Sequence, residues 1–491
     1  MSTSIPASAA PAPRTTAPHD AAPGTPPSSR APLPTVGARV RSRLATYGST
    51  RRILALDVAR ALAVIGMIAV HTMMVDQFSL AEPSTWPGIA HGHSAGLFAV
   101  LGGISIALFT GRQQLPTAAD MPRVRLQLVG RGAAIFTLGI LLEMLSTSVA
   151  VILPVWGILY VAILPFVRLR RRWLAAWAVG IALVAPLLTA LVQWLMLGPS
   201  GPGAQLVLYG TYHVPVWLSL MLVGLILGRS PLTRPRFAAA LAAGGAATAL
   251  ILLALAPALS ALAQDPSGSL GSSGGASVSA PAPVSTPAVP IAQVDSSLVC
   301  DANGDGSFYC HAPEDSAATA PANEGTGEEG AGKEGAGTEI PVLTAGKDSP
   351  EPADSGVASV WPDYLQRISG GTFATVPGAA LDPSPHAGTT AEIATTAAVA
   401  STIIGLCLLI ARPLRWLLLP LVALGSMPLT NYAAHIIVLF VLAGPTGTVN
   451  SPLVFAWLVG ALLVASTAWW LVMGRGPLER AVAAVARAAQ R

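Results

Sequence analysis

Long uncharged apolar segments alternate with short polar loops along most of this chain. A helix needs about 20 apolar residues to cross the hydrocarbon layer of a bilayer. The pattern predicts an all-α polytopic integral membrane protein with about ten transmembrane helices, at residues 53–75, 94–111, 128–146, 149–167, 173–197, 213–229, 237–263, 390–411, 416–441 and 453–474. The span 416–441 contains Pro428, which predicts a kinked or broken helix there.

The loops between these spans differ sharply in their arginine content. If the N-terminus is inside and the spans alternate, every inside loop carries several Arg residues, including the run Arg168-Leu-Arg170-Arg171-Arg172. The outside loops 76–93, 198–212 and 442–452 contain no Lys or Arg. Because Lys and Arg accumulate on cytoplasmic loops, both termini are predicted to be cytoplasmic.

Composition supports a membrane class and a modular layout. Charged residues make up only 11% of the 491 residues, against about 25% in soluble domains. The membrane domain is expected in two halves, of seven helices (49–263) and three helices (390–474). Between them lie a disordered acidic extracytoplasmic loop (264–356) and a partly ordered extracytoplasmic segment (357–389). The two ends are a disordered cytoplasmic tail (1–48) and a C-terminal cytoplasmic tail (475–491).

The Arg-rich, Lys-poor usage, with abundant Ala, Gly and Pro, is typical of GC-rich bacterial genomes. A multi-pass protein of a bacterial cytoplasmic membrane, in the cell envelope, is therefore expected. No basic recognition helix or zinc-finger spacing is present in the sequence, so no nucleic-acid partner is predicted.

Two cysteines, Cys300 and Cys310, lie ten residues apart in the segment predicted to be outside. An oxidising compartment permits a disulfide between them, and two free or only locally paired thiols are the alternative. No metal site is predicted, because the sequence has no tight histidine pair of the form His-x-x-x-His.

Ionisable residues inside a membrane are costly and mark functional positions. The first span contains Asp57, Arg60 and His71, which share one helix face at 100° per residue. Asp57 and Arg60 are one turn apart and can pair, whereas His71 lies about 16 Å beyond Arg60, near the outer surface. Two interpretations of the ion pair are equally good: it stabilises helix packing, or it has a functional role.

Most histidines map to the same predicted side of the bilayer. Six of the eight fall in outside loops or at outer helix ends, together with Glu143: His71, His91, His93, His213, His386 and His435. Imidazole is the usual general base near neutral pH. As a set, these residues predict a polar, outward-facing cavity between helices, although interfacial hydrogen bonding is the favoured explanation for any single histidine.

The broken span concentrates polar groups at membrane depth. Thr430, Asn431 and His435 follow Pro428 within about one and a half turns. They are interpreted either as interhelical hydrogen-bonding residues or as residues that line a substrate cavity.

Several motifs, taken in this order, carry a family resemblance. They are Leu56-Asp57-x-x-Arg60 with a polar residue at 71, the helix Leu97–Ser105, Pro385-His386-x-Gly388-Thr389, Gly425-Ser-Met-x-Leu-Thr-Asn-Tyr432 and Gly476-Pro-Leu-Glu479. The chain resembles the YeiB-like bacterial membrane proteins, within the broader group similar to heparan-α-glucosaminide N-acetyltransferase. Residues 265–355 have no counterpart in that resemblance.

The resemblance implies transfer of an acyl (acetyl) group from a cytoplasmic acetyl-CoA or related acyl-CoA to an extracytoplasmic sugar-like acceptor. His71, helped by His91 or His93, would be catalytic. In the N-acetyltransferase the catalytic His lies just before a Trp of the first outer loop, but here Pro83 stands at that position before Trp86. Position 71 is usually Asn in YeiB-like proteins, and His71 instead resembles the catalytic His of integral-membrane O-acyltransferases.

The remaining polar residues are assigned to substrate binding. Asp57 and Arg60 would organise the inner end of the donor channel, whereas the other candidates face the outer cavity: Glu143, His213, His386, Thr430, Asn431 and His435. A transporter or flippase with the same outward cavity, or a non-catalytic membrane sensor, are the alternatives. The expected partners are the lipid bilayer and a small-molecule or glycan acceptor, and a homodimer is left open.

Overall fold

The structure is a computed structural model that describes residues 35–49, 52–73, 78, 82–195, 201–204, 206–207, 210–263, 299–302, 308–311, 380–382 and 384–490. The chain divides into two units, one formed by Met1–Gln264 with Ala374–Arg491 and the other by Asp265–Phe373. Each unit is described by itself. Residues 1–34 of the predicted tail 1–48, most of the loop 264–356 and residues 357–379 lie outside the described residues.

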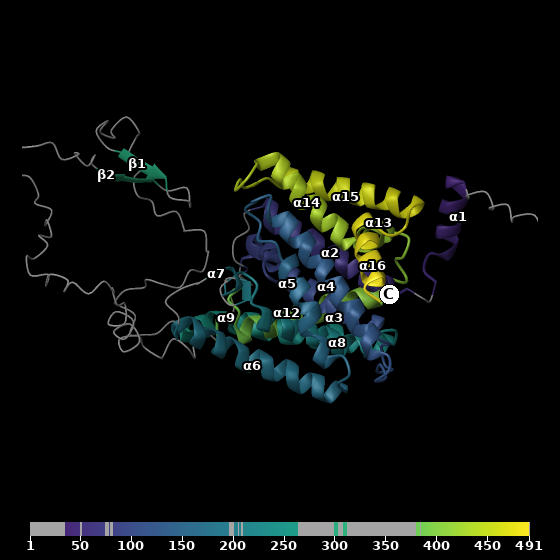
Figure 1. Cartoon of the computed structure of the whole chain (residues 1–491), viewed down its shortest axis with the longest axis horizontal. Helices are drawn as coiled ribbons and strands as arrows, with labels where there is room; N and C mark the ends of the chain where they lie inside the picture. Colours follow the sequence, from purple (N-terminus) through teal and green to yellow (C-terminus); the bar gives the residue numbers. More distant parts are fainter. Residues whose placement is uncertain are drawn as a thin grey trace, which may run out of the picture. The chain divides into compact units, whose positions relative to one another are not determined.

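The first unit is helical (Figure 1). Its helices are α1 (Val36–Thr46), α2 (Leu54–Thr72), the 3-10 helix η1 (Pro83–Ala90), α3 (His93–Phe109), α4 (Met121–Glu143), α5 (Leu153–Ala162), the 3-10 helix η2 (Leu164–Phe166), α6 (Arg171–Leu195), α7 (Gly201–Ala204), α8 (Val214–Gly228), α9 (Pro235–Ala263), α12 (Thr390–Ile410), α13 (Leu419–Gly425), α14 (Pro428–Ala443), α15 (Pro452–Val472) and α16 (Pro477–Ala488).

Seven helices of the described residues are long and apolar enough to cross a membrane, with Thr85–Phe109 counted as one of them. The bent pair α13 and α14 is an eighth candidate, and α5 and α8 are shorter apolar helices. Each of the ten predicted spans therefore contains an apolar helix or helix pair. The predicted fold class, a polytopic all-α membrane protein, is confirmed.

Proline marks many helix starts in the first unit. Many of the α-helices have Pro in their first turn, where the missing N–H would have had no helical partner, among them α4, α5, α8, α9, α13, α14, α15 and α16. Two helices occupy segments expected to be tails. Residues 36–46 form α1, which packs against α15, and residues 477–488 form α16, which packs against α4 and α14.

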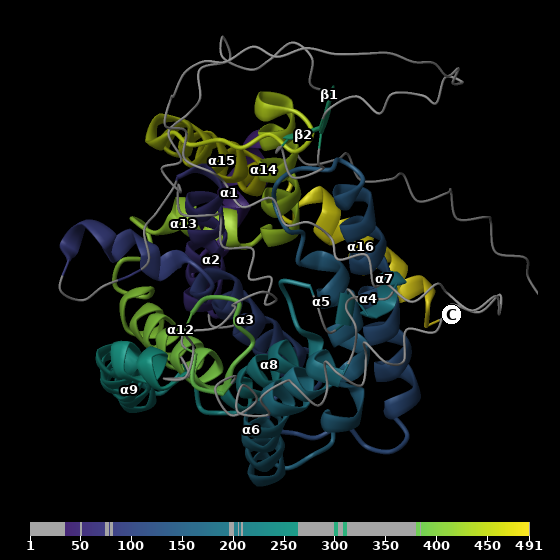
Figure 2. The same ribbon diagram turned by 90° about the vertical axis from the view of Figure 1, so that its left-hand side faces the viewer.

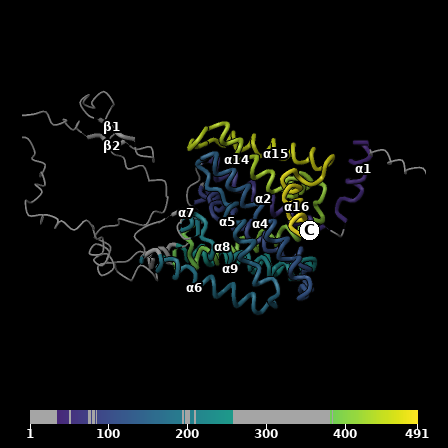
Figure 3. The backbone as a smooth tube through the Cα atoms, viewed as in Figure 1, coloured from purple at the N-terminus to yellow at the C-terminus, as the bar shows by residue number. Residues whose placement is uncertain are grey.

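Helix α2 is where the two halves of the membrane domain meet. It packs against α3 from the first half and against α12, α13, α14 and α15 from the second half. Its small residues allow this crowding, since Ala59, Ala61 and Ala63 are completely buried. Figure 2 shows α12 lying between α9 and α3. Figure 3 shows N-terminal and C-terminal helices of the unit interleaved.

Helices α3 and α8 approach each other to backbone contact. A Cβ atom on Gly103 would lie 1.9 Å from the backbone oxygen of Met221, and one on Gly224 would lie 2.0 Å from that of Val100. The glycine positions of the Leu97–Ser105 segment thus serve helix packing, which brings the start of α8 beside the start of α3.

The predicted break at Pro428 is confirmed, because α13 and α14 meet at an angle of 84°. Proline has no N–H to give to Leu424, four residues earlier. The Leu424 carbonyl accepts instead from the Asn431 side chain (2.9 Å) and from the Met427 N–H (3.0 Å). The Glu479 carboxylate accepts the N–H groups of Leu429 and Thr430 at the half-buried start of α14, where an anion is favourable.

The second unit contains the strands β1 (Val299–Ala302) and β2 (Phe308–His311), which pair antiparallel. Their register sets Cys300 directly opposite Cys310. The disulfide between these cysteines stays a prediction.

Candidate functional site

Six histidines gather at one end of the helical unit, and we call this group the histidine cluster: His71, His91, His93, His213, His386 and His435. They come from separate places in the chain. His71 ends α2, His91 and His93 join η1 to α3, and His213 caps the start of α8. His386 precedes α12 and His435 lies within α14. The six histidines expected on one side of the bilayer are thus close to one another.

The central contact is between His71 and His435. His71 Nδ1 lies 3.1 Å from His435 Nε2, and the two rings are nearly parallel, at 9° with centroids 5.4 Å apart. His435 is completely buried, and Tyr432 lies edge-on to it at 5.0 Å. At this distance one of the facing nitrogens can donate to the other, so each ring restricts the orientation of the other.

One tautomer of this pair leaves a free base on His71. If Nδ1 of His71 carries the proton, it donates to His435 Nε2, and the Nε2 lone pair of His71 stays free. Nδ1 of His435 is buried and makes no hydrogen bond to the described residues.

His386 lies at the centre of the remaining rings. Its centroid is 6.0 Å from that of His91 and 5.4 Å from that of Tyr212, both edge-on. Burial, together with the smaller effect of the nearby histidines, lowers the pKa of His386 to about 4; these neighbours are His91, His71, His213 and His93. Burial also lowers the pKa of His213. Both imidazoles are therefore neutral at pH 7, with one nitrogen able to donate and the other to accept.

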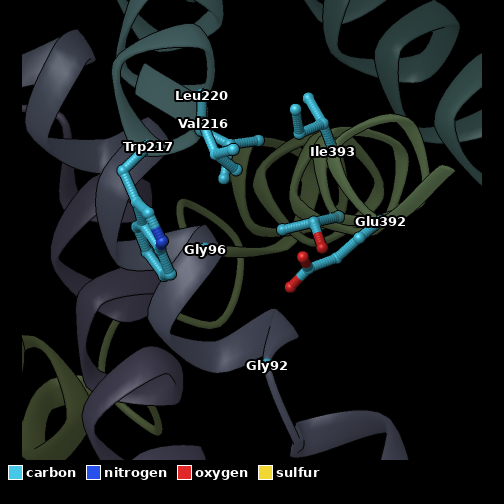
Figure 4. A pocket seen from close by; sticks show the side chains of 8 residues that line it. Gly92, Gly96, Val216, Trp217, Leu220, Glu392 and Ile393 are labelled. Carbon is cyan, nitrogen blue, oxygen red and sulfur yellow. The ribbon is translucent and has the colours of Figure 1, made fainter. Parts of the chain in front are cut away.

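A pocket opens beside His93, whose Nδ1 lies 2.8 Å from Thr396 Oγ1. Its empty space, including space open to solvent, is about 210 Å³. Only about 10 Å³ of this space is free for the centre of a water-sized molecule, which is room for about one water. Figure 4 shows Trp217 and Glu392 on opposite sides of it, with Gly96 between them. The full lining is Gly92, Gly96, Val216, Trp217, Leu220, Glu392, Ile393 and Thr396.

Glu392, in the first turn of α12, is 7% exposed and binds backbone groups of the preceding loop. Its Oε1 accepts the His386 N–H at 2.7 Å, and its Oε2 accepts the Gly388 N–H at 2.8 Å. The Thr389 hydroxyl accepts the Glu392 N–H at 3.1 Å. This loop thus carries His386 into the histidine cluster.

A second polar group lies at the other end of α2, ~21 Å from His71 along the helix. The predicted pair exists, because Arg60 donates to Asp57 at 2.7 Å. Arg52 also donates to Asp57, at 2.5 Å, and Arg60 donates to the Ser105 hydroxyl at 2.9 Å. Two guanidinium groups share one buried carboxylate here, so this end of α2 carries excess positive charge.

The other candidates make contacts of a different kind. The Thr430 hydroxyl donates to Glu479 at 2.6 Å, and the side-chain oxygen Oδ1 of Asn431 accepts from the Ser466 hydroxyl at 3.0 Å. These bonds hold α14 against its neighbours. Glu143 is exposed at the end of α4. A role in substrate binding stays a prediction for Glu143, Thr430 and Asn431.

Several residues of the site were not among the predicted ones: Arg52, Ser105, Tyr212, Glu392 and Thr396. Only Glu392 carries a local sequence signal. Thr389-x-x-Glu392 matches the capping box, in which the residue at the third helical position reaches back over the helix start. The others are brought in by helix packing. Within the described ranges, no three His, Cys, Asp or Glu side chains are placed to hold a metal ion.

Comparison with known proteins gives one family match. Residues 52–257 match the family model described as heparan-alpha-glucosaminide N-acetyltransferase, catalytic. No curated protein and no solved structure matches the chain significantly. The matched part contains Asp57, Arg60 and four cluster histidines, whereas His386 and His435 lie beyond it. The match indicates membrane acetyltransferase activity in general, and residues 52–257 are similar to the catalytic domain of heparan-α-glucosaminide N-acetyltransferase.

Proposed function

We propose that this protein transfers an acetyl or related acyl group from a cytoplasmic acyl-CoA-type donor to a hydroxyl or amine of a sugar-like acceptor on the other side of the membrane. The observation that carries the proposal is the position of His71. It lies in the segment that matches the acetyltransferase family, and within the histidine cluster it contacts His435.

His71 is suited to act as a general base. With Nδ1 engaged by His435, only Nε2 can face a substrate. This nitrogen would take the proton from the acceptor hydroxyl or amine while the acceptor atom attacks the thioester carbonyl. The carbon–sulfur bond breaks, a new carbon–oxygen or carbon–nitrogen bond forms, and the proton passes from His71 to the leaving thiolate. Transient transfer of the acyl group to Nε2 is the other route open to the same nitrogen.

The charge at the far end of α2 suits the donor. The positive charges of Arg52 and Arg60 exceed the single negative charge of Asp57. This end therefore attracts a polyanion such as the phosphate-bearing part of an acyl-CoA. The arginine distribution predicts that this end faces the cytoplasm. The thioester arm of the donor would then extend along α2 toward His71.

The bent helix pair allows comparison with the transporter alternative. Transporters of the inverted-repeat type have broken helices at corresponding positions in both halves. In the described part of the chain, α13 with α14 is the one pair bent in this way. A single break, with Leu424 satisfied by Asn431, fits a fixed packing feature better than a moving gate.

The test is transfer of labelled acetyl from acetyl-CoA by the purified protein in liposomes, with an envelope glycan fraction as acceptor. His71→Ala should lower transfer by about 10²–10⁴-fold, the usual contribution of a general base. His19→Ala, in the N-terminal region outside the described residues, is the matched control. Transfer by His71→Ala at the wild-type rate, or no transfer by the wild type, would overturn the proposal. Uptake of unmodified acceptor would favour the transporter.

A further inference from the structure

The loop Pro385–Thr389 enters α12 with an unusual backbone conformation. His386 has φ of +64° and Gly388 has φ of +71°. Glycine adopts this left-handed region freely, whereas other residues seldom do. A residue such as His386 keeps it only where neighbouring groups hold the backbone in place, and such positions concentrate at functional sites.

The Glu392 carboxylate supplies that restraint. Its two oxygens each accept one backbone N–H, from His386 and from Gly388, the two residues with positive φ. A carboxylate accepts with both oxygens, whereas the amide of glutamine accepts with only one. Because Glu392 is 7% exposed, water has little access to replace these bonds. Helix α12, which packs against α2, α3 and α8, gives the carboxylate a rigid support.

The loop held in this way completes one wall of the histidine cluster. It presents the His386 ring to His91 and Tyr212, and it brings the backbone of Gly388 against the His213 ring. His386 Nδ1 is buried and makes no hydrogen bond to the described residues. A buried nitrogen without a partner is unfavourable, so an acceptor hydroxyl or amine placed there would satisfy it.

We infer that Glu392 is a positioning residue, which holds His386 in the histidine cluster so that the second half of the membrane domain forms the acceptor-binding wall of the site. This inference rests on the proposed acyl transfer for its functional meaning. The contact between Glu392 and the loop is independent of it.

A double-mutant cycle tests the inference. Glu392→Gln keeps the shape of the side chain but offers an NH₂ group to one of the two backbone donors. It should lower kcat/KM for the acceptor by about 10²-fold, the effect of misplacing a site group by an ångström. In a His386→Ala background it should have no further effect, because the two residues act in series. Equal losses in both backgrounds would mean a general structural role and overturn the inference. Glu82→Gln, the same substitution at an exposed position of the first loop, is the matched control.

A second readout needs no activity. Carbethoxylation of His386 by diethylpyrocarbonate, measured by peptide mass spectrometry, should be several-fold faster in Glu392→Gln than in the wild type and unchanged in Glu82→Gln. If labelling responds but no variant transfers acyl groups, the proposed function fails and the positioning contact stands. If the wild type transfers acyl groups and Glu392→Gln changes neither readout, the inference fails alone.

Should Glu392→Gln not accumulate in the membrane, Gly388→Ala perturbs the same loop. Its φ of +71° disfavours alanine, and the new Cβ would lie 2.8 Å from His213 Nδ1. The same acceptor-specific loss and the same rise in His386 labelling are expected, and their absence would count against the inference.

Discussion

Neutralising Asp57 should destabilise the protein by a defined amount. The carboxylate is 3% exposed and accepts from Arg52 at 2.5 Å and from Arg60 at 2.7 Å. Asp57→Asn keeps the volume of the side chain but removes the charge. Arg60, whose other described bond is to the Ser105 hydroxyl, is then left as a charge without a counterion near the end of a membrane helix.

The magnitude follows from the exposure of the two arginines. Breaking a buried ion pair by removing one partner costs about 3–5 kcal/mol. The Arg60 side chain is 20% exposed. The cost of leaving its charge without Asp57 therefore lies near the lower limit of that range. The Arg52 side chain is 46% exposed, and a partner this accessible to water adds about 0–1 kcal/mol. Asp57→Asn should therefore lower the free energy of unfolding by about 3 kcal/mol.

The assay compares apparent unfolding midpoints and membrane abundance of the detergent-purified variants. Asp120→Asn, at an exposed carboxylate that bonds only to Thr117 among the described groups, is the control and should leave both unchanged. Asp57→Asn combined with Arg60→Met should regain part of the loss, because the unpaired charge is gone. A change below about 0.5 kcal/mol in the single variant, or no recovery in the double variant, would refute the reasoning.

Three other outcomes are expected. His435→Ala should lower transfer by about 10²-fold by releasing His71 from its productive orientation, and should have no further effect in a His71→Ala background. Because the pKa of His386 falls to about 4 on folding, the unfolded chain binds the extra proton between its ordinary pKa near 6.5 and pH 4. Stability should thus decline as pH falls through this window, and the unfolding midpoint of His386→Ala should decline less. Gly103→Ala would set a Cβ 1.9 Å from the Met221 backbone oxygen and should cost about 1–3 kcal/mol, measured by the same unfolding assay.

Much of the fold was predictable because lipid imposes a simple rule on sequence. A run of apolar residues long enough to cross the bilayer is nearly sufficient to specify a helix, and Pro428 was enough to predict the break between α13 and α14. The helices α1 and α16 were not predicted. They are short and carry charges, so their stability comes from packing on α15, α4 and α14, which local sequence does not reveal.

The side of the membrane on which the site lies could be predicted from the sequence, but the contacts between its residues could not. Arginine placement suggested that six histidines share one end of the bundle, but the pairing of His71 with His435 joins residues 364 positions apart. Such contacts depend on how α2 and α14 pack. Thr430 illustrates the same limit, because its polarity suggested a cavity position whereas its hydroxyl binds Glu479.

The most direct test of the central claim is sided acetyl transfer in liposomes that contain the protein in one known orientation. Labelled acetyl-CoA supplied on the face of the N-terminus should acetylate a glycan acceptor held only on the opposite face, and His71→Ala should abolish this transfer. Transfer that is independent of His71, or that requires donor and acceptor on the same face, would contradict a site built where His71 and His435 meet.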